Sequence, residues 1–226
     1  MLMNEETKIT LSEKELQLVC DTEWILTKHI IIEKVYRLFG KLAESMQSVI
    51  RENGERLPAE VCASTAKISK GENYRQLPYV MLDYPRHFNK VDVLAIRTLF
   101  WWGSFFSINL HLSGSFKTNV EKDLIAGFPF FQENDYWICV NEDPWQHHFE
   151  KDNYLLLKHC KPEDLTTIIN SRSFIKIAKK IPLTRWTGAA VFIENTFLEM
   201  TKLIELNYPT DGKGLSPGTP ITGSDL

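Results

Sequence analysis

Residues 93–102 and 105–112 constrain the fold of this chain most strongly, because they form two apolar runs on either side of Gly103 and Ser104. Both runs are rich in β-branched and aromatic residues, which favour strands. A two-residue loop that begins with glycine suits a type II′ turn between antiparallel strands. The sequence therefore predicts a β-hairpin at the centre of the chain.

The predicted turn sets the register of this hairpin, with Trp102 opposite Phe105, and divides its side chains between two faces. One face is expected to be apolar and to meet the helices: Ala95, Arg97, Leu99, Trp101, Phe106, Ile108, Leu110 and Leu112. The other face mixes rings with hydrogen-bonding groups: Ile96, Thr98, Phe100, Trp102, Phe105, Ser107, Asn109 and His111. A mixed face of this kind lines ligand cavities, although it also occurs on ordinary sheet surfaces.

Apolar residues at helical spacing predict long helices at both ends of the chain. A Ser-x-x-Glu capping box begins a short helix at Ser12, and a long helix is expected to follow from about Asp21 to Asn53. The last helix is expected over about 185–206. Two shorter helices are predicted over 162–170 and 173–180.

The remaining strands are expected over 78–84, 136–140 and 154–159, and short connections between neighbouring strands favour antiparallel pairing. The predicted fold is α+β, with a mainly antiparallel sheet of about five strands and the long N- and C-terminal helices packed on one face. Residues 1–206 are expected to form a single domain. Residues 207–226 contain three prolines and four glycines and are expected to form a flexible tail.

Arg97 is the one charged residue on the face predicted to be apolar. A buried charge is costly unless it is paired, and Asp83 on the preceding strand is the natural partner. A guanidinium group also binds a carboxylate or phosphate ligand through two parallel hydrogen bonds. The candidate ligand-binding residues are therefore Arg97, Asn109 and Trp102 on the hairpin and Arg86 in the connection before it.

The segment 141–152 holds two histidines and four carboxylates, the densest set of functional side chains in the chain. Such groups bind metals or transfer protons. His147 and His148 are therefore candidate metal ligands, and His111, His147 and His148 are candidate acid–base residues. Their spacing matches no HxH or HExxH motif, and a solvated hairpin loop explains the same composition.

Composition excludes several classes of function. The net charge of −3, without a dense run of Lys or Arg, disfavours binding to nucleic acid. The chain has no glycine-rich phosphate loop, and its cofactor, if any, stays unknown. Four cysteines without a CxxC pair indicate reduced thiols. No apolar stretch approaches the ~20 residues that cross a bilayer, and the N-terminus does not resemble a secretory signal, so a cytoplasmic protein is expected.

Three functions are compatible with these features. The first is a non-catalytic ligand-binding or protein-interaction protein, with a partner docking on the long helices or the C-terminal tail. The second is an enzyme that acts on a small anionic substrate, with Arg97 as the anion binder and His111, His147 or His148 as the acid–base group. The third is a metalloprotein with a histidine site in the 141–152 segment. The enzyme hypothesis requires Arg97 and one of these histidines to converge.

Overall fold

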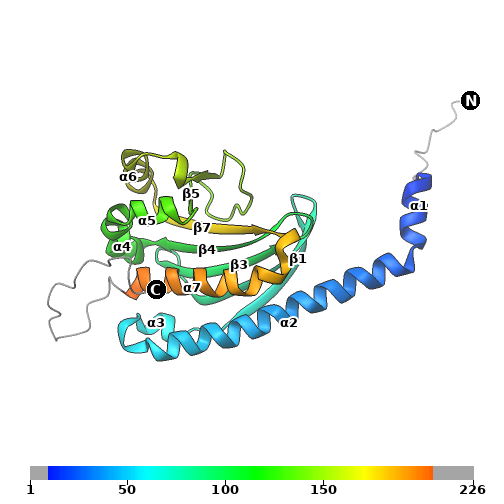
Figure 1. The fold of residues 1–226 in the computed structure, drawn as a ribbon, viewed down its shortest axis with the longest axis horizontal. Helices are drawn as coiled ribbons and strands as arrows, with labels where there is room; N and C mark the ends of the chain where they lie inside the picture. Colours follow the sequence, from blue (N-terminus) through cyan, green and yellow to red (C-terminus); the bar gives the residue numbers. More distant parts are fainter. Residues whose placement is uncertain (1–9, 206–226) are drawn as a thin grey trace, which may run out of the picture.

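The computed structural model describes residues 10–205, which form an antiparallel sheet and a set of helices (Figure 1). The strands are β1 Lys67–Tyr74, β2 Leu77–Phe88, β3 Val93–Trp101, β4 Phe105–Ser113, β5 Trp137–Cys139, β6 Tyr154–Leu156 and β7 Phe174–Pro182. The α-helices are α1 Glu13–Cys20, α2 Thr22–Glu52, α3 Ala59–Cys62, α4 Gly114–Ala126, α5 Phe128–Glu133, α6 Pro162–Ser171 and α7 Ala189–Glu205. The predicted α+β class with an antiparallel sheet is confirmed.

The sheet has seven strands in the order β1-β2-β3-β4-β7-β5-β6, where about five were predicted. One extra strand is β1, whose polar sequence resembles a loop because β1 lies at the edge of the sheet. The other is β7, where a helix over 173–180 was predicted. It pairs along its whole length with β4, and this tertiary pairing overrides the local pattern.

The β3–β4 hairpin has a three-residue loop, so the predicted register is wrong by one residue. Trp101, and not Trp102, lies opposite Phe105. Gly103 takes a positive φ of 70° in the loop, and the backbone N–H of Trp102 donates to the oxygen of Pro78. Because of this shift, each β3 side chain lies on the opposite face from the one predicted relative to β4. Arg97 therefore lies opposite Asn109.

The two faces of the sheet are covered differently. The helix face packs against α2, α4 and α7 and forms the main core. Its members on the hairpin are Leu94, Ile96, Phe100, Phe106, Ile108, Leu110 and Leu112. The opposite face, here called the loop face, carries smaller clusters of rings together with the polar residues. Its members on the hairpin are Ala95, Arg97, Leu99, Trp101, Phe105, Ser107, Asn109 and His111.

The N-terminal helices extend beyond the sheet, as Figure 1 shows. The predicted capping box at Ser12 is present, and the side chain of Asp21 accepts a hydrogen bond from the N–H of Trp24 and caps α2. None of the residues of α1 is buried, and the first buried residue of α2 is Val35. We call residues 13–30 the helical arm. Its exposed large apolar residues are Leu16, Leu18, Val19, Trp24, Ile25, Leu26 and Ile30.

No helix within residues 10–205 is long and apolar enough to cross a bilayer. The four cysteines are free, with Cys139 buried and Cys20 and Cys62 exposed. The predicted flexible tail, residues 207–226, lies outside the described residues. The division into one domain over 1–206 stays a prediction.

Candidate functional site

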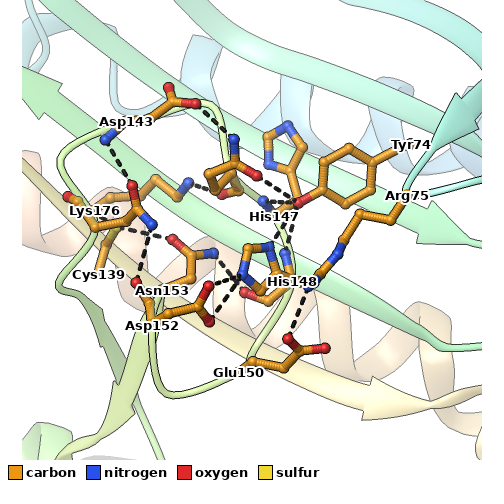
Figure 2. Close-up of polar contacts among 12 residues, drawn as sticks. Tyr74, Arg75, Cys139, Asp143, His147, His148, Glu150, Asp152, Asn153 and Lys176 are labelled. Atoms are coloured by element: carbon orange, nitrogen blue, oxygen red, sulfur yellow. Dashed lines mark hydrogen bonds and ion pairs between the residues drawn. The ribbon is translucent and has the colours of Figure 1, made fainter.

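The connection between β5 and β6, here called the 140–153 loop, lies across the loop face of the sheet (Figure 2). It contains both candidate histidines of the 141–152 segment. The ring of Trp145 lies 5.4 Å from the Arg97 guanidinium and 5.6 Å from the His111 ring. The structure therefore brings the predicted residues Arg97, Asn109, His111, His147 and His148 together.

Arg97 forms the predicted ion pair with Asp83, although on the opposite face from the one predicted. Its Nε and Nη2 atoms donate to the two carboxylate oxygens of Asp83 at 2.6 and 3.1 Å. Both side chains are largely buried, and the Nδ2 of Asn109 donates to the backbone oxygen of Arg97. In this buried bidentate pair, the carboxylate of Asp83 neutralises the charge of the Arg97 guanidinium.

His111 is enclosed by the rings of Trp145 and Phe174, whose centroids lie 5.6 and 5.5 Å from its own. Burial, together with the positive charges of Lys176 and Arg97, lowers the pKa of His111 to about 3. The imidazole is therefore neutral near pH 7, where it accepts a proton only weakly.

Lys176 on β7 is a functional residue that the sequence did not reveal, since its segment was predicted to be helical. Only 1% of the residue is exposed. Its ammonium donates to the backbone oxygen of Pro144 at 2.7 Å and to that of Gln146, and it lies 5.3 Å from the Tyr154 ring. Burial lowers the pKa of Lys176 to about 8. The lysine thus fastens the middle of the loop to the sheet.

Tyr74, the last residue of β1, fastens the next part of the loop. The two residues after it, Arg75 and Gln76, both have positive φ and form the two-residue turn into β2. The Tyr74 hydroxyl accepts the backbone N–H groups of His147 at 2.7 Å and His148 at 3.1 Å (Figure 2). The loop backbone is therefore held from two sides, by β1 and by β7.

The two adjacent histidines have different surroundings. His148 is buried, with its Nδ1 atom 3.0 Å from the Tyr74 hydroxyl and its Nε2 atom 3.2 Å from Asp152. The His147 ring packs against the ring of Tyr74, and its Nδ1 atom is buried without a hydrogen-bond partner among residues 10–205. Burial, followed by the charge of Lys176, lowers the pKa of His147 well below its usual value.

The remaining two predicted residues lie elsewhere. Trp102 is at the tip of the hairpin, where its ring meets those of Phe100 and Trp24. Arg86 donates from its Nε atom to the backbone oxygen of Thr65, close to the start of β1. Neither contact joins the cluster beneath the 140–153 loop.

An open groove lies between the edge strand β6 and helix α6, with a volume of about 1070 Å³. We call it the β6–α6 groove. Its apolar walls are formed by Trp137, Phe149, Tyr154, Leu155, Leu156 and Ile168. Its polar lining consists of Glu150, Lys151, His159, Cys160, Asp164 and Thr167. The sequence offered one signal for this groove, the aromatic ring of Phe149 within a largely polar segment.

Phe149 connects the groove with the polar cluster. Its ring stacks on that of Tyr154, with centroids 4.5 Å apart and an angle of 12° between the planes, and it meets Trp137 edge-on at 5.3 Å. Because Phe149 directly follows the residues that Tyr74 holds, the hydrogen bonds of the loop backbone also place this wall of the groove.

Comparison of the chain with protein-family models, with curated proteins and with solved structures gave no match.

Proposed function

We propose that this chain is a non-catalytic binding protein that takes a small, largely apolar molecule into the β6–α6 groove. The observation that carries the proposal is the groove itself, with a volume of about 1070 Å³ and six apolar residues in its walls. Sites for small molecules are typically concave, apolar and of roughly this size, with a few polar groups at fixed positions.

The groove also indicates the chemistry of the ligand. Three of its wall residues carry aromatic rings, which favour stacking or edge contacts with a ring of the ligand. The polar lining holds the acidic Glu150 and Asp164 together with the basic Lys151, so it does not favour an anionic ligand. We therefore expect an uncharged ligand that contains an aromatic ring.

The buried polar cluster supports the groove in this proposal. Arg97 is paired with Asp83. Lys176 and Tyr74 form hydrogen bonds with the backbone of the loop. Groups that are satisfied within the chain stabilise one conformation, here the one that places Phe149 in the groove wall. Because Phe149 is already fixed in the groove wall before a ligand binds, less conformational entropy is lost on binding.

The enzyme hypothesis stays a prediction. The corrected register puts Arg97 and His111 on one face, which that hypothesis requires. An anionic substrate would, however, have to displace Asp83 from Arg97 and lift Trp145 from both residues. Breaking a buried ion pair typically costs about 3–5 kcal/mol, so the apolar groove is favoured over this cluster as the ligand site.

A fluorescence titration with N-phenylnaphthylamine tests the proposal, since this uncharged probe brightens in apolar surroundings. The key variant is Thr167→Trp, which places a large ring in the lining of the groove. The matched control is Asn170→Trp, on the same helix at an exposed position outside the lining. Both variants change solvent-exposed positions and leave the core intact.

We expect saturable binding of one probe per chain, at least about tenfold weaker in Thr167→Trp and unchanged in Asn170→Trp. Because the helical arm also exposes apolar surface, a third variant, Leu26→Glu with Ile30→Glu, is titrated in parallel. Binding that is lost in the arm variant but retained in Thr167→Trp would contradict the proposal.

A further inference from the structure

We propose that His148, Glu150 and Asp152 form a binding site for a divalent transition-metal ion at the end of the 140–153 loop. Each residue offers one ligand atom, and these three atoms lie within 4.8 Å of one another. The three side chains lie next to one another in Figure 2. The site shares Glu150 with the lining of the β6–α6 groove, but the inference does not depend on the groove having a ligand.

The charges of the three groups favour a cation. Glu150 and Asp152 place two carboxylates close together, and both side chains are largely exposed. Arg75 pairs with Glu150 at 3.0 Å and offsets one of the two negative charges. A divalent ion between the carboxylates would offset the negative charge that remains.

The present contact between His148 and Asp152 is weak enough to be replaced. The Nε2 atom of His148 lies 3.2 and 3.3 Å from the two carboxylate oxygens, so its hydrogen bond is shared and long. Charge-assisted N–H···O bonds are usually about 2.7–2.9 Å long. A metal ion bound to Nε2 would replace this long hydrogen bond with a stronger metal–nitrogen bond.

The Tyr74 hydroxyl lies against the other ring nitrogen of this histidine. The Nδ1 atom of His148 lies 3.0 Å from the Tyr74 hydroxyl, which is also 3.3 Å from the Oε1 atom of Gln146. The contact at Nδ1 holds the ring so that its Nε2 atom faces Asp152. Contacts of this kind on the far nitrogen orient the rings of metal-bound histidines.

The donor set indicates which ions would bind. One imidazole and two carboxylates suit first-row transition metals such as Zn²⁺ and Co²⁺, with water completing the coordination. Because both carboxylates are solvent-exposed, an ion reaches the site without opening the fold.

Calorimetric titration of the full chain with Zn²⁺ tests the inference. The variants are Glu150→Gln and Asp152→Asn, which remove a ligand charge from the surface without changing its size. The control is Glu142→Gln in the same loop, whose side chain is 92% exposed and lies outside the group of three. We expect one Zn²⁺ per chain, with affinity lowered at least about tenfold in each ligand variant and unchanged in the control.

Two results would overturn the inference. The first is the absence of stoichiometric Zn²⁺ binding to the parent chain. The second is binding that is equally strong in both ligand variants, which would place the ion elsewhere, for example on the exposed thiols of Cys20 or Cys62. Asp152 does not line the groove, so the Asp152→Asn variant separates failure of the metal site from failure of the proposed function.

Discussion

The hydroxyl group of Tyr74 shows how strongly the conformation of the 140–153 loop depends on single side chains. It accepts two consecutive backbone N–H groups, those of His147 and His148, from a segment more than seventy residues away in the sequence. A buried N–H group that loses its acceptor costs free energy, because no water replaces the missing bond. Tyr74 therefore stabilises both the fold and the position of Phe149.

The variant Tyr74→Phe is expected to lower the free energy of unfolding by about 1–3 kcal/mol, because the loop N–H groups lose their common acceptor. Urea denaturation measures this difference. The control Tyr36→Phe removes a hydroxyl on the helix side of the sheet and should change stability much less. Equal stability of Tyr74→Phe and the parent chain would show that the hydroxyl does not hold the loop.

His111 makes stability depend on pH in a defined window. Its pKa is about 3 in the folded chain and 6.5 in the unfolded chain, so the unfolded state takes up the proton first as pH falls. Its contribution is constant above about pH 6.5 and is lost progressively down to about pH 3. The full loss is on the order of 5 kcal/mol.

The variant His111→Phe keeps a ring between Trp145 and Phe174 but has no proton to bind. We expect its stability to fall less steeply than that of the parent chain between pH 6.5 and pH 3, as measured by urea denaturation at a series of pH values. Parallel pH profiles for the two chains would contradict the assigned neutral histidine.

Part of the site could be predicted at the scale of residues. The Arg97–Asp83 pair followed from the cost of an unpaired charge on one of two neighbouring strands. The sheet face on which Arg97 lies could not be predicted from the sequence, because it depends on whether the hairpin loop has two or three residues. Tyr74 and Lys176 were missed because their roles come from contacts distant in sequence.

At the scale of elements, the helical arm differs from every other long segment because its apolar side chains are exposed. The eight-residue α1 has no buried residue, and a helix of that length is marginal in water without tertiary packing. Contiguous exposed apolar surface marks an interaction site in many soluble proteins. The predicted protein partner on the long helices stays a prediction that this surface supports.

Deletion of residues 1–20 removes α1 but keeps Asp21, which caps α2. We expect the free energy of unfolding to change by less than about 0.5 kcal/mol, because none of residues 10–20 is buried. Urea denaturation of the shortened chain measures the effect. A loss of about 2 kcal/mol or more would mean that α1 packs on the body of the protein.

Elements with strong local signals were predicted well and the others were not. The long helix α2 follows from its 3.6-residue apolar period and from the cap at Asp21. Strand β7 did not follow, since its first five residues are buried on both faces and the adjacent Lys179 and Lys180 interrupt the alternation of a half-exposed strand. Strand β1 was predicted mainly as a loop, with only a short strand near 66–69, because its edge position permits a polar sequence.

At the scale of the whole molecule, the sheet separates the main hydrophobic core from the polar cluster. The helix face builds the main core with α2, α4 and α7, while the loop face holds the polar cluster and the 140–153 loop. The β6–α6 groove forms where this loop meets the edge of the sheet. Its walls combine β5, β6, α6 and Phe149, so no local pattern in the sequence predicts it.

The indole N–H resonances of the six tryptophans, followed by NMR during titration with N-phenylnaphthylamine, test the groove most directly. Trp137 lines the groove, whereas Trp24 lies on the helical arm. We expect the Trp137 resonance to move with probe concentration while that of Trp24 stays in place. A shift of Trp24 without a shift of Trp137 would contradict binding in the groove.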